Sequence, residues 1–187
     1  MTTRIGGGSA RGRRLATPAG QAVRPTLGRV RRSLFDILLH GEPGLDGARV
    51  LDAFAGTGAL GLEALSRGAA TATFFDTERA ALDALRANVA ALGVRDHAFV
   101  RPADATRPPV ADAPADIVLL DPPYRSGLGG KALAALAATG WIGDTTLVAW
   151  EQGTEFPEAA PAGFVETDRR RYGGTTLVFL RRVEAVE

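Results

Sequence analysis

The chain has 187 residues, of which 45% are hydrophobic and 23% are charged, with a formal net charge of +1. This length suits a single domain with a sizeable core, and this composition excludes a disordered or fibrous protein. The sequence contains no cysteine and only two histidines, which excludes disulfides and a thiol nucleophile and leaves little for a metal site or a Ser-His-Asp triad. No apolar run approaches the roughly 20 residues of a membrane helix, and no apolar block follows the basic N-terminus. We therefore expect a cytoplasmic protein without a bound metal.

In chain order, the positive charge comes first. Residues 1–35 hold eight arginines and no acid, whereas the other 152 residues carry 14 basic and 21 acidic side chains. A guanidinium can form two hydrogen bonds to a phosphate and can stack on bases. This charge asymmetry is therefore typical of a protein that binds a polyanion through one local region. We predict a basic extension over residues 1–23 that contacts a nucleic acid, followed by one domain over residues 24–187. A merely solvated, frayed terminus is the alternative.

Hydrophobic periodicity then predicts helices and strands in alternation. The predicted helices span residues 27–39, 59–67, 78–92 and 131–138, and the predicted strands span 49–54, 71–75, 98–101, 117–120, 147–150, 164–167 and 175–180. This alternation favours a doubly wound, Rossmann-like α/β fold with a mostly parallel seven-stranded sheet. The last two strands have no helix between them, so we expect an antiparallel hairpin at one end of the sheet.

A glycine motif follows the first predicted strand and opens a helix. It runs from Asp52 to Gly61 and contains Gly56 and Gly58. Glycines let the backbone turn sharply and approach a ligand closely. In the dinucleotide fold this spacing holds a pyrophosphate at a helix N-terminus, with an acid about 20 residues further on. Asp76 stands 20 residues after Gly56, so this motif alone leaves a nicotinamide or flavin nucleotide open.

Acids at the ends of neighbouring strands favour a different ligand. Asp52 ends the first strand, Asp76 ends the second and Asp104 follows the third. These carboxylates meet at the edge where open α/β sheets bind ligands. S-adenosylmethionine carries a sulfonium, an ammonium, a ribose diol and an adenine amine but no phosphate, so it suits these acids better than NAD does. A turn-capping role for Asp104 is the alternative.

A second motif, Asp121-Pro122-Pro123-Tyr124, directly follows the fourth strand. An exocyclic base amine is a poor nucleophile because its lone pair is delocalised into the ring. The Asp121 carboxylate and the Pro122 carbonyl can accept its two N–H groups and aim the lone pair. Tyr124 offers a ring on which an extruded base can stack. The motif therefore predicts a methyltransferase that acts on a base amine.

With both motifs in place, the chain resembles the bacterial RsmD family of class I S-adenosylmethionine-dependent methyltransferases over almost its whole length. The resemblance also rests on segments outside the two motifs, namely Arg24-Pro25-Thr26, Arg29-Val30-Arg31, residues 34–38, residues 51–69 and Tyr172-Gly173. It implies methylation of the exocyclic N2 of a guanine in 16S ribosomal RNA of the small subunit. One departure is Asp76, where glutamate is more usual; either acid can accept from a ribose diol.

The resemblance also implies a role for each candidate residue. Gly56 and Gly58 would lie against the methionine part of the cofactor, Asp76 would bind the ribose, and Asp104 with Ala105 would bracket the adenine. Asp52 and Phe54 complete the cofactor set. Asp121, Pro122 and Tyr124 would hold the guanine. The RNA-binding candidates are Arg11, Arg13, Arg14, Arg24, Thr26 and Arg29.

Other interpretations remain open at this point. A DNA adenine or cytosine amino-methyltransferase would use the same active-site motif, although no region is large enough for a separate target-recognition domain. A non-catalytic, RNA-binding ribosome-assembly factor is a second alternative. The sequence leaves Glu151, Tyr172 and the basic run Arg169–Arg171 undecided between structural and RNA-facing roles. We expect a monomer.

Overall fold

A computed structural model of the chain describes residues 3–18 and 26–183. In this part of the chain the elements are α1 (Thr26–His40), β1 (Arg49–Asp52), α2 (Ala59–Ser66), β2 (Thr71–Asp76), α3 (Arg79–Leu92), β3 (Ala98–Pro102), β4 (Ala115–Leu120), α4 (Leu128–Ala138), β5 (Ile142–Gly153), β6 (Phe164–Tyr172) and β7 (Thr175–Arg182). Each predicted element is present, with shifted boundaries. No helix among the described residues is long and apolar enough to cross a membrane.

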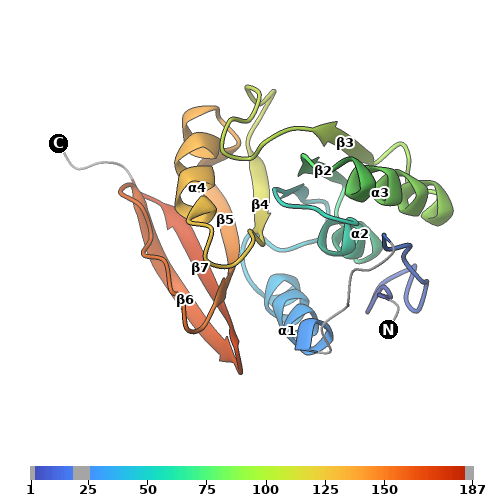
Figure 1. The fold of residues 1–187 in the computed structure, drawn as a ribbon, viewed down its shortest axis with the longest axis horizontal. Helices are drawn as coiled ribbons and strands as arrows, with labels where there is room; N and C mark the ends of the chain where they lie inside the picture. Colours follow the sequence, from blue (N-terminus) through green and yellow to red (C-terminus); the bar gives the residue numbers. More distant parts are fainter. Residues whose placement is uncertain (1–2, 19–25, 184–187) are drawn as a thin grey trace.

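The strands form one seven-stranded sheet in the order β3-β2-β1-β4-β5-β7-β6. The five strands from β1 to β5 run parallel, and β7 lies antiparallel between β5 and β6 (Figure 1). The predicted fold, with its antiparallel C-terminal hairpin, is confirmed. The chain moves outward from β1 to β3 and then returns to β4 on the other side of β1. Doubly wound sheets bind ligands at this reversal, beyond the carboxyl ends of the strands.

Apolar side chains cover both faces of the sheet. Phe74 and Phe75 are neighbours on β2, are both fully buried, and belong to opposite cores. One core includes the buried faces of α1, α2 and α3, whereas α4 covers the other. Because successive residues on a strand point to opposite faces, burial on both sides requires continuous apolar runs. Trp141 and Trp150 lie in the core on the α4 side.

The largest boundary differences are in β5, which extends over Ile142–Gly153 where residues 147–150 were predicted, and in β6. The predicted strand over residues 164–167 is β6, which continues through the charged run to Tyr172. This run has no apolar alternation, because β6 is an edge strand exposed on both faces for most of its length. Its backbone pairs with β7 all the way to Thr175. Charged side chains on an edge strand also discourage pairing with another sheet.

The first part of the predicted N-terminal extension packs on the body of the domain. Residues 3–15 fold back on themselves, with the Ile5 amide donating to the Arg13 carbonyl and the Leu15 amide donating to the Thr3 carbonyl. Ile5 and Leu15 are buried in the core shared with α2 and α3. The Asn88 side chain of α3 binds the backbone of Ala16 through both its oxygen and its nitrogen. This segment is therefore part of the folded domain.

A buried carboxylate joins this segment to two helices. Glu63 of α2 is 0% exposed and forms ion pairs with Arg31 of α1 at 2.9 Å and Arg67 at 2.8 Å. It also accepts a hydrogen bond from the Gly6 amide at 3.1 Å. Arg31 is one of the N-terminal arginines that suggested polyanion binding, but here it neutralises a buried acid. Two counter-charges and a backbone donor compensate for the desolvation of Glu63.

Candidate active site

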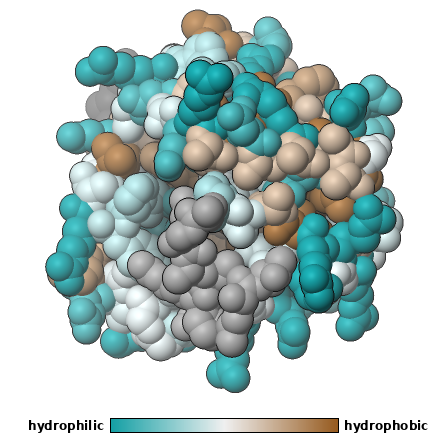
Figure 2. All heavy atoms as spheres, turned by 45° about the vertical axis from the view of Figure 1, so that its right-hand side comes forward, coloured by the Kyte–Doolittle hydropathy of each residue, from teal (hydrophilic) through white to brown (hydrophobic). Residues whose placement is uncertain are grey.

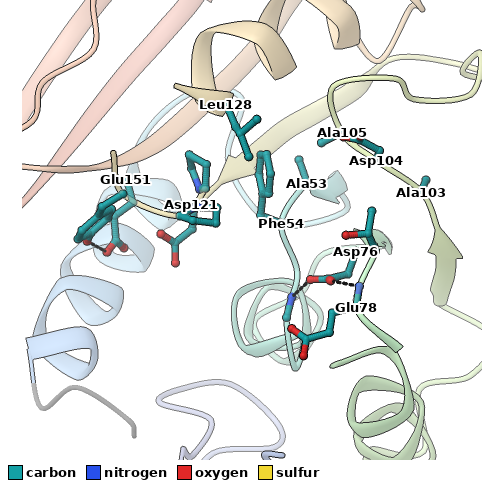
Figure 3. Close-up of a pocket in the computed structure, with 15 residues that line it drawn as sticks. Ala53, Phe54, Asp76, Glu78, Ala103, Asp104, Ala105, Asp121, Leu128 and Glu151 are labelled. Atoms are coloured by element: carbon teal, nitrogen blue, oxygen red, sulfur yellow. Dashed lines mark hydrogen bonds between the residues drawn. The ribbon is translucent and has the colours of Figure 1, made fainter. Parts of the chain in front are cut away.

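A cavity of about 560 Å³ lies beyond the carboxyl ends of the parallel strands (Figure 3). Its lining residues are Ala53, Phe54, Gly56, Asp76, Thr77, Glu78, Ala103, Asp104, Ala105, Asp121, Pro122, Pro123, Tyr124, Leu128 and Glu151. Figure 3 shows Asp121 and Glu151 on one side and Asp76, Glu78 and Asp104 on the other, with Phe54 and Leu128 between them. One cavity thus brings together the glycine motif, the strand-end acids Asp76 and Asp104, and the second motif.

Asp76 ties the glycine loop to the start of α3. One of its carboxylate oxygens accepts a hydrogen bond from the Gly56 amide at 2.7 Å, and the other accepts one from the Glu78 amide at 2.8 Å (Figure 3). These bonds hold the carboxylate at the end of β2, on the cavity wall. Because each carboxylate oxygen has more than one lone-pair direction, Asp76 can still accept from a ligand hydroxyl.

Asp104 lines the cavity and also caps a turn, which was the alternative role considered for it. One carboxylate oxygen accepts hydrogen bonds from the Thr106 amide and hydroxyl, each at 2.8 Å. These bonds stabilise the charged form and lower the pKa of Asp104. The next residue, Ala105, is buried and contributes a small apolar surface beside the carboxylate.

The two candidate glycines have different surroundings. Gly56 lines the cavity with a positive φ of 53°, and a Cβ placed there would meet no atom within 4 Å. Gly58 precedes α2 with a φ of 82°, and its Cβ would lie 2.2 Å from the Leu85 Cδ1 atom. Gly58 is absent from the lining. Its geometry shows a need for close packing and a left-handed backbone.

Asp52, expected to contact the cofactor, instead lies beneath the cavity. It is 1% exposed and is absent from the lining. Its Oδ2 atom accepts a hydrogen bond from the Gly61 amide at 2.9 Å, in the first turn of α2. Among the described residues, no hydrogen-bond partner of its Oδ1 atom is found. Burial, with a smaller contribution from the nearby charge of Asp76, raises the pKa of Asp52 to about 7.

The second motif follows β4 and forms the other side of the cavity. Leu120 of β4 pairs with Trp150 of β5, so Asp121, directly after β4, lies next to Glu151 of β5. The Tyr124 hydroxyl donates to Glu151 Oε1 at 2.7 Å and lies 3.3 Å from the Thr175 hydroxyl of β7. Burial raises the pKa of Tyr124, which keeps its phenol protonated. These contacts fix the orientation of the tyrosine ring.

Two acids on the cavity wall fall outside the candidate site residues of the sequence analysis. Glu151 is 7% exposed and directly follows the predicted strand 147–150, so the rule of acids at strand ends points to it as well. Glu78 comes two residues after Asp76 and shares the same side of the cavity (Figure 3). Glu78 falls at the start of the predicted helix over residues 78–92, a position that indicated no ligand role.

The charge of the lining defines what the cavity can hold. Five carboxylates line it, and no lysine, arginine or histidine of residues 3–18 or 26–183 does; the acids are Asp76, Glu78, Asp104, Asp121 and Glu151. Such a wall attracts a sulfonium and an ammonium group and repels a pyrophosphate. The donors and acceptors present therefore fit S-adenosylmethionine and do not fit a dinucleotide. Among the described residues, no group of three or more acids, histidines or cysteines could hold a metal ion.

The RNA-binding candidates whose side chains the structure describes lie outside this cavity. Arg11, Arg13, Arg14 and Arg29 are exposed, the first three on the N-terminal segment and Arg29 on α1. Arg13 donates to the Ala91 carbonyl at 2.7 Å. Arg24 and the side chain of Thr26 lie outside the described part of the chain. The face that brings α3 and the N-terminal segment forward is largely hydrophilic, with scattered apolar side chains (Figure 2).

Fold and site together define the class. A sheet of this order, a glycine loop after β1 and an acidic cavity at the switch point are those of a class I methyltransferase with a cofactor of the S-adenosylmethionine type. Residues 3–181 match the family described as "Conserved hypothetical protein 95". The chain belongs to this family, the RsmD family of methyltransferases, and the resemblance seen in the sequence is confirmed.

Individual relatives support this assignment. The chain is 41% identical to ribosomal RNA small subunit methyltransferase D of Escherichia coli over 152 residues, which are 81% of this chain and 75% of the relative. It is 32% identical to YlbH of Bacillus subtilis over 185 residues, covering 96% and 98% of the two chains. The solved structure of yhhF from Escherichia coli superimposes with a TM-score of 0.82 at 36% identity, covering 97% of this chain and 98% of that one.

Proposed function

We propose that this protein transfers a methyl group from S-adenosylmethionine to the exocyclic N2 amine of a guanine in 16S ribosomal RNA of the small subunit. The observation that carries the proposal is the single acidic cavity whose two sides are the strand-end acids and the Asp121–Tyr124 motif. Its walls can accept a cationic cofactor and a base amine side by side. Relatives named ribosomal RNA small subunit methyltransferase D supply the class of RNA.

The chain offers a set of residues for each part of the cofactor. Asp76, held by the Gly56 and Glu78 amides, would accept from the ribose diol. Asp104 and Ala105 would flank the adenine, and Phe54 and Gly56 would border the methionine part. Asp52 and Gly58 would act from below: Asp52 holds the first turn of α2, and Gly58 allows α2 to approach α3.

The acceptor side would position and activate the amine. The Asp121 carboxylate and the Pro122 carbonyl would accept the two N–H groups of the amine, and the Tyr124 ring would stack on the extruded base. S-adenosylmethionine supplies an electrophilic methyl group on its sulfonium. Asp121 and Pro122 would direct the amine lone pair toward that methyl group, and Asp121 or water would take the proton that the amine loses on transfer.

The proposal is tested with labelled S-adenosylmethionine and three acceptors: undermethylated small ribosomal subunits, stripped 16S RNA and duplex DNA. We expect label on the subunits, located by nuclease digestion and mass spectrometry on a guanine N2. Label on DNA would replace the proposal with a DNA amino-methyltransferase. Cofactor binding without label on any acceptor would favour the non-catalytic assembly role.

A further inference from the structure

Arg125, directly after Tyr124, has a backbone conformation that its residue type disfavours. Its φ is +64°, and it is the one non-glycine residue with a positive φ in the described part of the chain. The Ser126 amide donates to the Pro123 carbonyl at 3.3 Å, which closes a four-residue turn with Arg125 in the third position. Turns with a positive φ at this position favour glycine or asparagine. An arginine here points to a use for its side chain.

The Arg125 side chain is exposed and lies on an aromatic ring. Its guanidinium carbon is 3.9 Å from the ring centroid of Phe156, a close cation–π contact. Among the described residues, no ion pair of Arg125 is found. Phe156 is itself next to the site, because a Cβ on Gly153 would lie 3.3 Å from Tyr124 and 3.6 Å from Phe156. The ring therefore holds a cation beside the proposed base-stacking tyrosine.

The acidity of the cavity creates a requirement that this cation meets. Five carboxylates attract the cofactor, but the same charges repel the phosphates of an RNA strand that delivers a base. A planar guanidinium can bind two phosphate oxygens at once. In the sequence, Arg125 is the cation nearest to Asp121 and Tyr124, whereas Arg11, Arg13 and Arg14 lie on the N-terminal segment packed against α2 and α3.

We propose that Arg125, pre-oriented by Phe156, binds an RNA phosphate next to the nucleotide whose base enters the cavity. This inference rests on the proposed function, since it takes an RNA strand as the substrate. Arg125 would act as a positioning residue: it would hold the backbone while Tyr124 and Asp121 receive the base. The N-terminal arginines would contribute separately, by attracting RNA over a longer range.

The main test variant is Arg125→Asn, because asparagine tolerates a positive φ and removes only the cation. Arg95→Asn is the matched control. It removes an exposed arginine from the loop before β3, at the end of the parallel strands opposite to the cavity. Binding to undermethylated small subunits is measured at salt concentrations from 50 to 200 mM, under conditions in which no methyl transfer takes place. Binding of S-adenosylmethionine and thermal unfolding are measured for the same variants.

For Arg125→Asn we expect about tenfold weaker binding to subunits, and a slope of log affinity against log salt that is smaller by about 0.7–0.9. Cofactor binding and thermal stability should match those of the parent chain, and Arg95→Asn should bind normally. Phe156→Leu should weaken binding by a few-fold but retain the salt slope, because the Arg125 guanidinium keeps its charge but loses the aromatic ring that orients it. Arg125→Lys should be intermediate.

An unchanged salt slope and affinity in Arg125→Asn would overturn the phosphate contact, as would an equal loss in Arg95→Asn. These outcomes are distinct from failure of the proposed function, which would appear in the parent chain as label on DNA or on no acceptor. If the parent chain methylates the subunits and Arg125→Asn binds them like the parent, only the present inference fails.

Discussion

Replacing Asp52 with asparagine should make the protein more stable, increasingly so as the pH rises. Asp52 is buried with one oxygen on the Gly61 amide, and its pKa is raised from 3.8 to about 7. The native state thus binds this proton more tightly than the unfolded state, so ionisation at higher pH lowers the stability. Asparagine keeps the shape and an oxygen acceptor for Gly61 but carries no charge.

The magnitude follows from the size of the pKa shift. One pKa unit corresponds to about 1.4 kcal/mol, so burial of this group costs roughly 2 kcal/mol at pH 5 and roughly 4 kcal/mol at pH 8. The Asp52→Asn variant should therefore gain roughly 2–3 kcal/mol relative to the parent chain between these two pH values. Because Asp52 is almost fully buried, solvent screening reduces this figure little.

The assay is urea unfolding of both proteins at pH 5 and pH 8, followed by circular dichroism. Asp96→Asn, an exposed position in the loop before β3, controls for the loss of one negative charge. The reasoning would be refuted by a stability difference between Asp52→Asn and the parent that is equal at both pH values. Lower stability of the variant at pH 8 would show that the charged form of Asp52 is the one the fold requires.

Three further perturbations separate catalysis, folding and RNA attraction. Asp121→Ala should reduce methyl transfer at least a hundredfold with cofactor binding largely intact, measured by label transfer and calorimetry; joint loss of both would make the carboxylate structural. Glu63→Gln should lower the free energy of unfolding by about 3–5 kcal/mol because it leaves two partly buried arginines without their anion. Urea unfolding measures this, and a change below about 1 kcal/mol would contradict it. Replacing Arg11, Arg13 and Arg14 together with alanine should raise the KM for subunits and flatten its salt dependence. If the KM of this variant depends on salt as it does in the parent chain, these arginines do not contact the RNA.

The local sequence patterns were sufficient to predict the class of fold and the two motifs that line the cavity. Helical and strand periodicities follow from where each residue points, so they predict α/β alternation without knowledge of the partners. The glycine motif and the Asp121–Tyr124 motif each follow a buried strand directly. Because parallel strands end at one edge of a sheet, their position in the chain already indicates a shared site.

Contacts between distant segments were decided by the tertiary structure. The polar run of β6 extends to Tyr172 because its backbone pairs with β7, a non-local contact that leaves no periodic signal. Asp52 lies below the cavity, and Arg31 neutralises the buried Glu63 instead of facing solvent. Burial of a charged group depends on what packs over it, which sequence spacing does not encode.

The contacts around Tyr124 show the same division between sequence and structure. Its place in a motif was evident from the sequence, whereas its partners Glu151 and Thr175 come from β5 and β7. Phe156 holds Arg125 because β4 and β5 are adjacent and parallel, so that the loops after them emerge together. The sequence determined which groups could perform the chemistry, and the order of strands in the sheet determined which of them meet, because chain segments far apart in sequence become neighbours only through pairing and packing.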